Sequence, residues 1–143
     1  MCSAIDRRSV WPVARLGDLL AFGPQNGLYK PSSKYGSGTP IVRIDSFQSG
    51  TFSVARSLKR LDATPAEIAL YGVIESDLVI NRVNSPEYLG KSALVPELME
   101  PTVFESNMMR MRLDSGAAVP LYINQYLQTT AAKRYVGSRA KHS

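Results

Sequence analysis

Residues 82–91 gather side chains that can form hydrogen bonds to nucleic-acid bases or phosphates. Arginine and asparagine side chains can each place two hydrogen bonds on one base, and lysine can contact a phosphate. The candidates in this stretch are Arg82, Asn84, Ser85, Glu87, Tyr88 and Lys91. The same composition is typical of an ordinary solvated loop. Two interpretations are therefore open, a nucleic-acid contact and a plain surface loop.

A β-hairpin over residues 77–95 is the element that would present these side chains. Residues 78–80, Leu-Val-Ile, form a β-branched apolar run, and the polarity changes abruptly after it. Pro86 favours a turn, and Gly90 can adopt the positive φ that a returning chain needs. Residues 91–95 resume an alternating pattern. The sequence therefore predicts two paired strands with a polar tip.

The segment 23–38 is expected to be a long loop. It holds four glycines and two prolines and shows no apolar periodicity. Loops of this length in compact domains are often functional. Lys30, Lys34, Tyr29 and Tyr35 stand among the glycines and would suit contact with a nucleic-acid backbone. A flexible surface loop is an equal alternative.

A strand over residues 40–45 would place Arg43 and Asp45 on one face. The simpler interpretation is a mutual ion pair, which we favour. The alternative is that Asp45 holds Arg43 ready for guanine or phosphate. The turn 46–50 that follows carries Gln48, a side chain suited to adenine.

The end of the stretch 102–113 alternates between apolar and basic side chains. Met109 and Met111 alternate with Arg110 and Arg112, which predicts a strand with one core face and one basic face. Methionines at this spacing are typical of core filling.

The remaining pattern predicts three helical pieces beside five or six short strands. Asp18 is a candidate N-cap for a helical turn over residues 19–22. Residues 64–67, Thr-Pro-Ala-Glu, combine a capping box with a proline start for a helix to about Leu70. Apolar residues recur at helical spacing over residues 120–137. We predict an α+β fold: a small twisted, mainly antiparallel sheet with short helices and a C-terminal helical segment.

The net charge of +5, from 17 basic and 12 acidic residues, weakly favours a polyanionic partner. Residues 54–61 hold three basic side chains, Arg56, Lys59 and Arg60, and no acid. Residues 133–143 hold four basic side chains and no acid. Such runs are often solvated faces, so each is either that or a phosphate-binding surface.

Catalysis within this chain is not expected. The only histidine is His142, so a nucleophile would have no base, and a small hydrolase is disfavoured. Zinc needs clustered ligands, and the only cysteine is Cys2. We therefore expect no metal and no cofactor. A single cysteine fits a reducing cytoplasm, and no run approaches the ~18 apolar residues that span a bilayer, nor is a signal peptide or anchor expected.

Five motifs follow one another between about residues 10 and 136. They are Trp11 with Leu16-Gly17-Asp18-Leu19; residues 25–30, Gln-Asn-Gly-Leu-Tyr-Lys; residues 35–44, Tyr-Gly-Ser-Gly-Thr-Pro-Ile-Val-Arg-Ile; residues 72–85, Gly-Val-Ile-Glu-Ser-Asp-Leu-Val-Ile-Asn-Arg-Val-Asn-Ser, followed by Leu-Gly-Lys-Ser-Ala-Leu-Val; and Val103-Phe104-Glu105-Ser106 leading to Met109-Arg110-Met111-Arg112-Leu113. In this order they resemble the target recognition domain of DNA specificity subunits in type I restriction-modification systems.

The resemblance implies a domain that recognises one half of a split duplex DNA sequence from the major groove and makes no catalytic step. In that family a DNA adenine methyltransferase subunit methylates with S-adenosylmethionine, and a restriction subunit translocates and cleaves. A second specificity half would complete the target. Asp77, Gly90 and Arg82 match the shared signature, which implies scaffold or phosphate-contacting roles.

The chain also departs from the family pattern. We expect residues 1–143 to form one target recognition domain, with a core at about 10–127 and a basic helical tail at 128–143. The sequence stops where the family's long connecting helix would begin, without the usual Pro-rich closing segment. We therefore expect an isolated domain or a truncated half-subunit.

Phosphate contacts are predicted at Lys30, Lys34 and Lys91, and base contacts at Gln48, Arg60, Asn84 and Asn107. The full predicted DNA-binding set adds Lys59, Arg82 and Ser85. The rival hypothesis is a non-catalytic α+β protein-interaction domain whose basic surface is incidental. Steep salt dependence with a preference among duplexes would distinguish the first hypothesis from the second.

Overall fold

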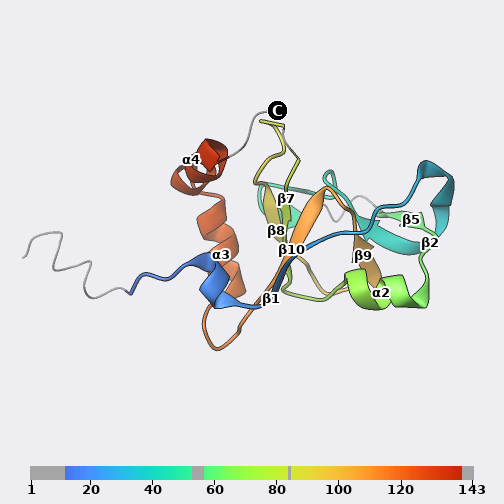
Figure 1. Ribbon diagram of the computed structural model, residues 1–143, viewed down its shortest axis with the longest axis horizontal. Helices are drawn as coiled ribbons and strands as arrows, with labels where there is room; N and C mark the ends of the chain where they lie inside the picture. The colour runs from blue at the N-terminus through green and yellow to red at the C-terminus, as the bar shows by residue number, and fades with distance from the viewer. Residues whose placement is uncertain (1–11, 53–56, 84, 140–143) are drawn as a thin grey trace, which may run out of the picture.

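The computed structural model describes residues 12–52, 57–83 and 85–139. These residues form two four-stranded sheets, a small hairpin and helices at either end (Figure 1). The first sheet has the order β1 (Leu20–Asn26), β10 (Met108–Leu113), β7 (Leu78–Asn81) and β8 (Ser92–Leu94). The second has the order β5 (Lys59–Leu61), β2 (Tyr35–Val42), β9 (Thr102–Phe104) and β6 (Gly72–Val73). Strands β3 (Phe47–Gln48) and β4 (Thr51–Phe52) form the hairpin.

All strand pairs are antiparallel except β2 with β9. The helical elements are η1 (Leu16–Leu19), η2 (Ser32–Lys34), α2 (Pro65–Tyr71), α3 (Pro120–Leu127) and α4 (Thr130–Arg139). Helices α3 and α4 lie at one end of the molecule, and β2, β5 and α2 lie at the other (Figure 1). The predicted α+β class, with mainly antiparallel pairing and a C-terminal helical segment, is confirmed. The described residues hold ten strands, more than the five or six predicted.

Strand β7 is buried on both faces and joins two parts of the core. Leu78 and Ile80 pack with residues of β10, α3 and α4. Val79 packs on the other side with Val42 and Phe104 from the second sheet. Alternation along one strand therefore ties the helical end of the molecule to the second sheet.

Two predicted elements form as expected. β7 and β8 pair antiparallel, with Ile80 opposite Ser92, so the hairpin over residues 77–95 is confirmed, and Gly90 has φ +78°. In α2 the Thr64 hydroxyl accepts a hydrogen bond from the Glu67 amide at 3.1 Å, and the Thr64 amide donates to the Glu67 carboxylate. The capping box is confirmed.

The predictions for the first third of the chain were partly wrong. Residues 20–26 form β1 rather than a helix capped by Asp18, and only residues 27–31 of the expected loop 23–38 lie between regular elements. β1 pairs along β10, far away in sequence, and register shifts on either side of Phe22 hide its alternation. The distant partner therefore overrides the local signals.

Three further boundaries differ from the predictions. Strand β2 ends at Val42 and the chain turns over residues 44–46, so 40–45 is not one strand. Gln48 lies in β3, at the edge of the expected turn. The expected helix 120–137 is two helices, because the Thr129 hydroxyl accepts the Ala132 amide at 3.2 Å and starts a new one.

Candidate nucleic-acid interface

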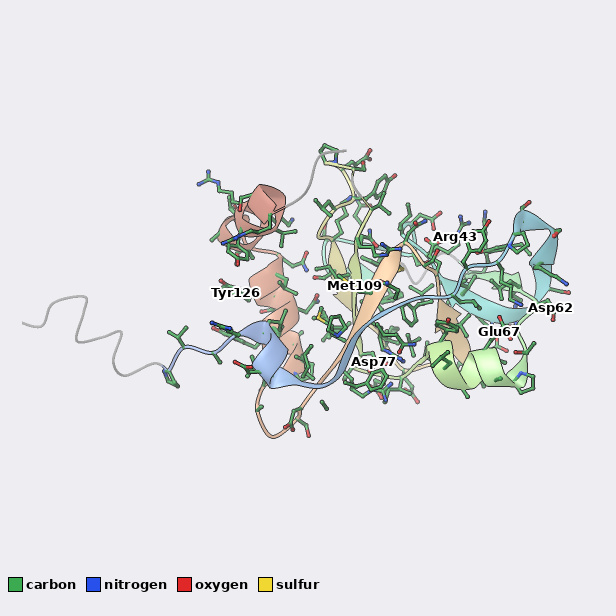
Figure 2. The ribbon with its side chains drawn as sticks, in the orientation of Figure 1. Arg43, Asp62, Glu67, Asp77, Met109 and Tyr126 are labelled. Carbon is green, nitrogen blue, oxygen red and sulfur yellow. The ribbon has the colours of Figure 1, made fainter. Side chains whose placement is uncertain are left out.

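Several predicted DNA-binding residues line one cleft of about 610 Å³ between the two sheets' loops. Lys30, Lys59 and Asn107 come from three separate segments and face this cleft together. The other lining residues are Leu28, Tyr29, Pro31, Ser32, Tyr35, Arg43, Glu105 and Ser106. We call it the Arg43 cleft. Arg43 lies in the half of the molecule away from Tyr126 (Figure 2).

Backbone hydrogen bonds bring the walls of the Arg43 cleft together. The Leu28 amide donates to the Phe104 carbonyl at 2.8 Å, and the Ser106 amide donates to the Leu28 carbonyl at 3.0 Å. A Cβ atom on Gly27 would lie 2.1 Å from the Glu105 carbonyl oxygen, so only glycine permits this approach. The loop carrying Lys30 is therefore fixed against the turn carrying Asn107.

Glu105 holds Arg43 in this cleft. Its carboxylate accepts a hydrogen bond from the Arg43 Nε at 3.2 Å and another from the Ile44 amide at 2.8 Å. The Arg43 guanidinium lies 5.6 Å from the centre of the Tyr35 ring. The favoured ion pair between Arg43 and Asp45 was wrong, because the chain leaves the strand conformation after Val42 and the two side chains no longer share a face.

Burial, above all, raises the pKa of the Tyr35 phenol above 10.0; the nearby Arg43 charge lowers it and the Glu105 charge raises it. Tyr35 is therefore neutral at physiological pH. A neutral aromatic ring beside the Arg43 guanidinium is the arrangement that favours a cation–π contact.

Lys30 and Lys34 differ in their surroundings. The Lys30 ammonium donates to the Glu67 carboxylate at 2.8 Å, and this bond is the main reason that the pKa of Glu67 falls below its ordinary value. The Lys30 ammonium is thus fixed on the cleft wall by Glu67, and it keeps two further N–H donors. Lys34 is exposed, 4.0 Å from Asp62, and is not among the residues that line the cleft.

The tip of the β7–β8 hairpin lies beside the Arg43 cleft. The Arg82 Nε donates to the Ser106 carbonyl at 2.8 Å, and the Arg82 amide donates to the Asn107 carbonyl at 3.0 Å. Lys91 lies 5.0 Å from the centre of the Tyr88 ring, and the Ser85 carbonyl accepts the Leu89 amide in the turn. Asn84 lies outside the described residues. Arg82 therefore extends the basic surface from the cleft onto the hairpin.

Two predicted contacts lie elsewhere. Arg60 follows Lys59 on β5, so its side chain points to the opposite face of the strand. There it pairs with Glu100 and donates to the Gly38 carbonyl at 2.8 Å. Gln48 is exposed on the β3–β4 hairpin, which packs against β8 rather than against the cleft walls. Arg56 lies outside the described residues.

The predicted basic face of β10 was wrong. Arg110 is 3% exposed and faces Asp77. Asp77 is fully buried and directly precedes the neighbouring strand β7. The Asp77 carboxylate accepts two hydrogen bonds from Arg112 at 2.7 and 2.9 Å and one from the Ile74 amide. Hydrogen bonding to Asp77 raises the pKa of Arg112, and burial lowers that of Arg110. Both arginines therefore stabilise the fold through Asp77 instead of forming an open basic surface.

The sequence pointed to Asn107 as a base contact but not to the role of Glu105, two residues before it. A carboxylate 62 residues from its arginine leaves no local spacing signal. The one usable signal was Glu105 itself, an acidic residue that directly follows the apolar pair Val103-Phe104 and precedes the neutral residues Ser106 and Asn107. Within the described parts of the chain, no group of three metal-ligating side chains is found and no helix is long and apolar enough to cross a membrane.

No protein-family model matches the chain. Two curated proteins are similar in sequence, both with the name of a type I restriction enzyme specificity subunit. The putative MjaX subunit of Methanocaldococcus jannaschii is 27% identical over 91% of this chain and 31% of its own length. The EcoKI subunit of Escherichia coli is 27% identical over 76% of this chain and 24% of its own length.

The fold has a solved counterpart. A chain from a structural study of complex assembly and conformational transition of the type I R-M system covers 85% of this chain and 29% of its own length. The TM-score is 0.57 at 19% identity. The resemblance to target recognition domains of type I specificity subunits is confirmed by these comparisons. The chain spans less than a third of the length of the relatives it matches.

Proposed function

We propose that this chain binds duplex DNA sequence-specifically through the Arg43 cleft and the adjoining hairpin tip. The observation that carries the proposal is the convergence of Lys30, Lys59 and Asn107, from three separate segments, on one cleft, with Arg82 bonded to the Ser106 carbonyl of the cleft wall. Similarity to proteins named specificity subunits supports the same role. Basic and amide side chains together supply both phosphate and base contacts.

Exposure and ion pairing suggest different roles for the residues of this surface. Lys59 is exposed and no acidic side chain in the described ranges pairs with it, so it is the foremost phosphate contact. Lys30 contributes charge while Glu67 holds it. Asn107 is exposed at the cleft rim and can contact a base. The proposed outer footprint comprises Lys34, Asn84, Ser85 and Lys91, and it leaves out Gln48 and Arg60, which lie away from the cleft.

We further propose that the chain acts as part of a specificity subunit in the cytoplasm. It would direct adenine methylation by a DNA adenine methyltransferase subunit and cleavage by a restriction subunit, beside a second specificity half. No catalytic step is assigned to this chain. Its contribution is the choice of sequence.

A protein-interaction domain is the second candidate. Leu121, Tyr122 and Tyr126 are more than half exposed on α3, on the far side from the Arg43 cleft. Large exposed apolar side chains on one helix are a feature of protein contact surfaces. This hypothesis predicts that binding to duplex DNA is absent or insensitive to salt.

Salt dependence with two matched lysine variants tests the proposal. Binding to duplex DNA should weaken steeply with salt, and Lys59→Ala should reduce the slope of log K against log salt by about 1. Lys133→Ala, an exposed lysine on α4, should leave the slope unchanged. Equal effects of the two variants would place the DNA elsewhere and contradict the proposed surface.

A further inference from the structure

The backbone of Arg43 is fixed at the point where β2 ends. Its amide donates to the Ser46 hydroxyl at 2.9 Å, and its carbonyl accepts the Ser46 amide at 2.9 Å. The neighbouring Val42 carbonyl accepts the Glu105 amide at 3.0 Å. The Cα–Cβ direction of Arg43 is therefore set by the fold before any ligand arrives.

The Arg43 guanidinium is held only at its Nε edge. Glu105 is 8% exposed and accepts from the Nε of Arg43, while its other oxygen is bound to the Ile44 amide. No hydrogen bond from either Nη atom is found within the described parts of the chain. The far end of the guanidinium thus keeps its donors available, with the Tyr35 ring limiting its rotation.

The surroundings select what this end can bind. Lys30 and Lys59 line the same cleft, and Glu105 is the one acid among its lining residues. A partner must therefore offer acceptors rather than donors or positive charge. Guanine presents two adjacent acceptors, O6 and N7, in the major groove, whereas adenine presents a donor beside N7.

The fixed orientation of Arg43 separates a base from a phosphate. A phosphate contact needs only a positive charge nearby, which the exposed Lys59 on the same cleft can supply. A bidentate contact to a base needs a guanidinium whose plane is fixed, and Glu105 holds that of Arg43 through its Nε.

We propose that Arg43 recognises a guanine in the target sequence through its two Nη groups, with Glu105 as the positioning residue that orients the guanidinium. This inference rests on the proposed function and deepens it by assigning one base and the residue that contacts it. Glu105 contacts no base itself, and Tyr35 supports the plane of the arginine.

The test compares the full chain with Arg43→Lys and Arg43→Met in selections from a random duplex library, with Lys59→Ala as the control. The wild-type motif should contain one invariant guanine. Both Arg43 variants should lose the preference at that position alone, and binding to the wild-type motif should fall roughly 5- to 150-fold. Lys59→Ala should weaken binding and leave the motif unchanged.

A base analogue tests the contact without altering the protein. Replacing that guanine by 7-deazaguanine removes the N7 acceptor and should weaken wild-type binding about tenfold or more, with no further loss in Arg43→Met. Glu105→Gln should reduce discrimination between guanine and adenine at this position while the salt slope stays constant.

The outcomes separate the two claims. A recovered motif that Arg43→Lys and Arg43→Met leave intact would overturn the guanine assignment while the proposed function stands. Uniform weakening with a flatter salt slope would make Arg43 a phosphate contact and would also overturn it. A wild-type chain that recovers no motif would overturn the proposed function together with this assignment.

Discussion

Asp77→Asn tests the buried charge network that supports the sheet carrying the hairpin. Asp77 is fully buried, accepts two hydrogen bonds from Arg112 and lies 3.8 Å from Nη1 of Arg110. The asparagine has nearly the same shape and keeps one acceptor oxygen. The change therefore removes a charge rather than volume.

The cost arises mainly at Arg110. Arg112 is 36% exposed and can turn its guanidinium toward water, but the Arg110 side chain is 4% exposed and cannot. The rings of Phe22 and Phe104, 4.9 and 5.4 Å from the Arg110 guanidinium, offset part of its burial. Removing one partner of a buried ion pair costs about 3–5 kcal/mol, a large share of a domain's stability.

Thermal and urea unfolding measure this loss. Asp77→Asn should lower Tm by roughly 10 °C, since a chain of this size loses about 2–4 °C for each kcal/mol. Asp45→Asn is the matched control, because Asp45 is exposed, and it should change stability by less than about 0.5 kcal/mol. The reasoning also predicts that Asp77→Asn with Arg110→Met recovers part of the loss.

A Tm for Asp77→Asn within about 2 °C of the wild type would refute this reasoning, because it would mean that Arg110 needs no counter-charge. A double variant less stable than Asp77→Asn alone would also refute it. In that case the hydrogen bonds of Arg110 to the Gly72 carbonyl and Gln25, rather than its charge, would dominate.

The remaining predictions concern two other polar groups. Asn81 is 2% exposed and its side-chain amide has no hydrogen-bond partner in the described residues, so Asn81→Leu should leave urea stability unchanged or raise it; a loss above about 2 kcal/mol would show that the amide is satisfied. By NMR titration, Glu67 should titrate below its ordinary value of 4.5 in the wild type and closer to it in Lys30→Met. Because the pKa of Glu67 is lower in the folded state, the ion pair adds stability at pH values above the unfolded-state pKa, near 4.5. This contribution should vanish as the pH falls through the folded-state pKa. A difference in stability between the wild type and Lys30→Met that persisted below that pH would contradict the prediction.

Local signals predicted the elements whose causes lie within a few residues. The capping box at Thr64 and Glu67 fixed the start of α2, and the apolar run before a polar turn identified the β7–β8 hairpin. Both depend on contacts between near neighbours, which sequence spacing records. In the structure, strand β7 of this hairpin is buried on both faces, as Val79 and Ile80 show. Burial on both faces explains why its apolar residues form a continuous run instead of alternating with polar ones.

Long-range pairing accounts for what the sequence did not reveal. β1 forms because β10 offers it an edge, and its register shifts obscure any alternation. The alternation of Arg110 and Arg112 was predicted correctly, but both side chains pair with the buried Asp77, and Arg110 is itself buried. At the site, Lys30, Lys59 and Asn107 were predicted individually, and only the fold brings them beside Arg43 and Glu105.

Selection of the purified wild-type chain against a random duplex library at ~150 mM salt tests the central claim most directly, because specific binding survives that salt and competition while non-specific binding largely does not. Recovery of a motif of a few base pairs, lost when Lys59 and Asn107 are both replaced by alanine but kept when Lys133 is replaced, is the predicted result. A library that emerges unenriched, or a motif that the paired cleft variant leaves at full strength, would contradict the account.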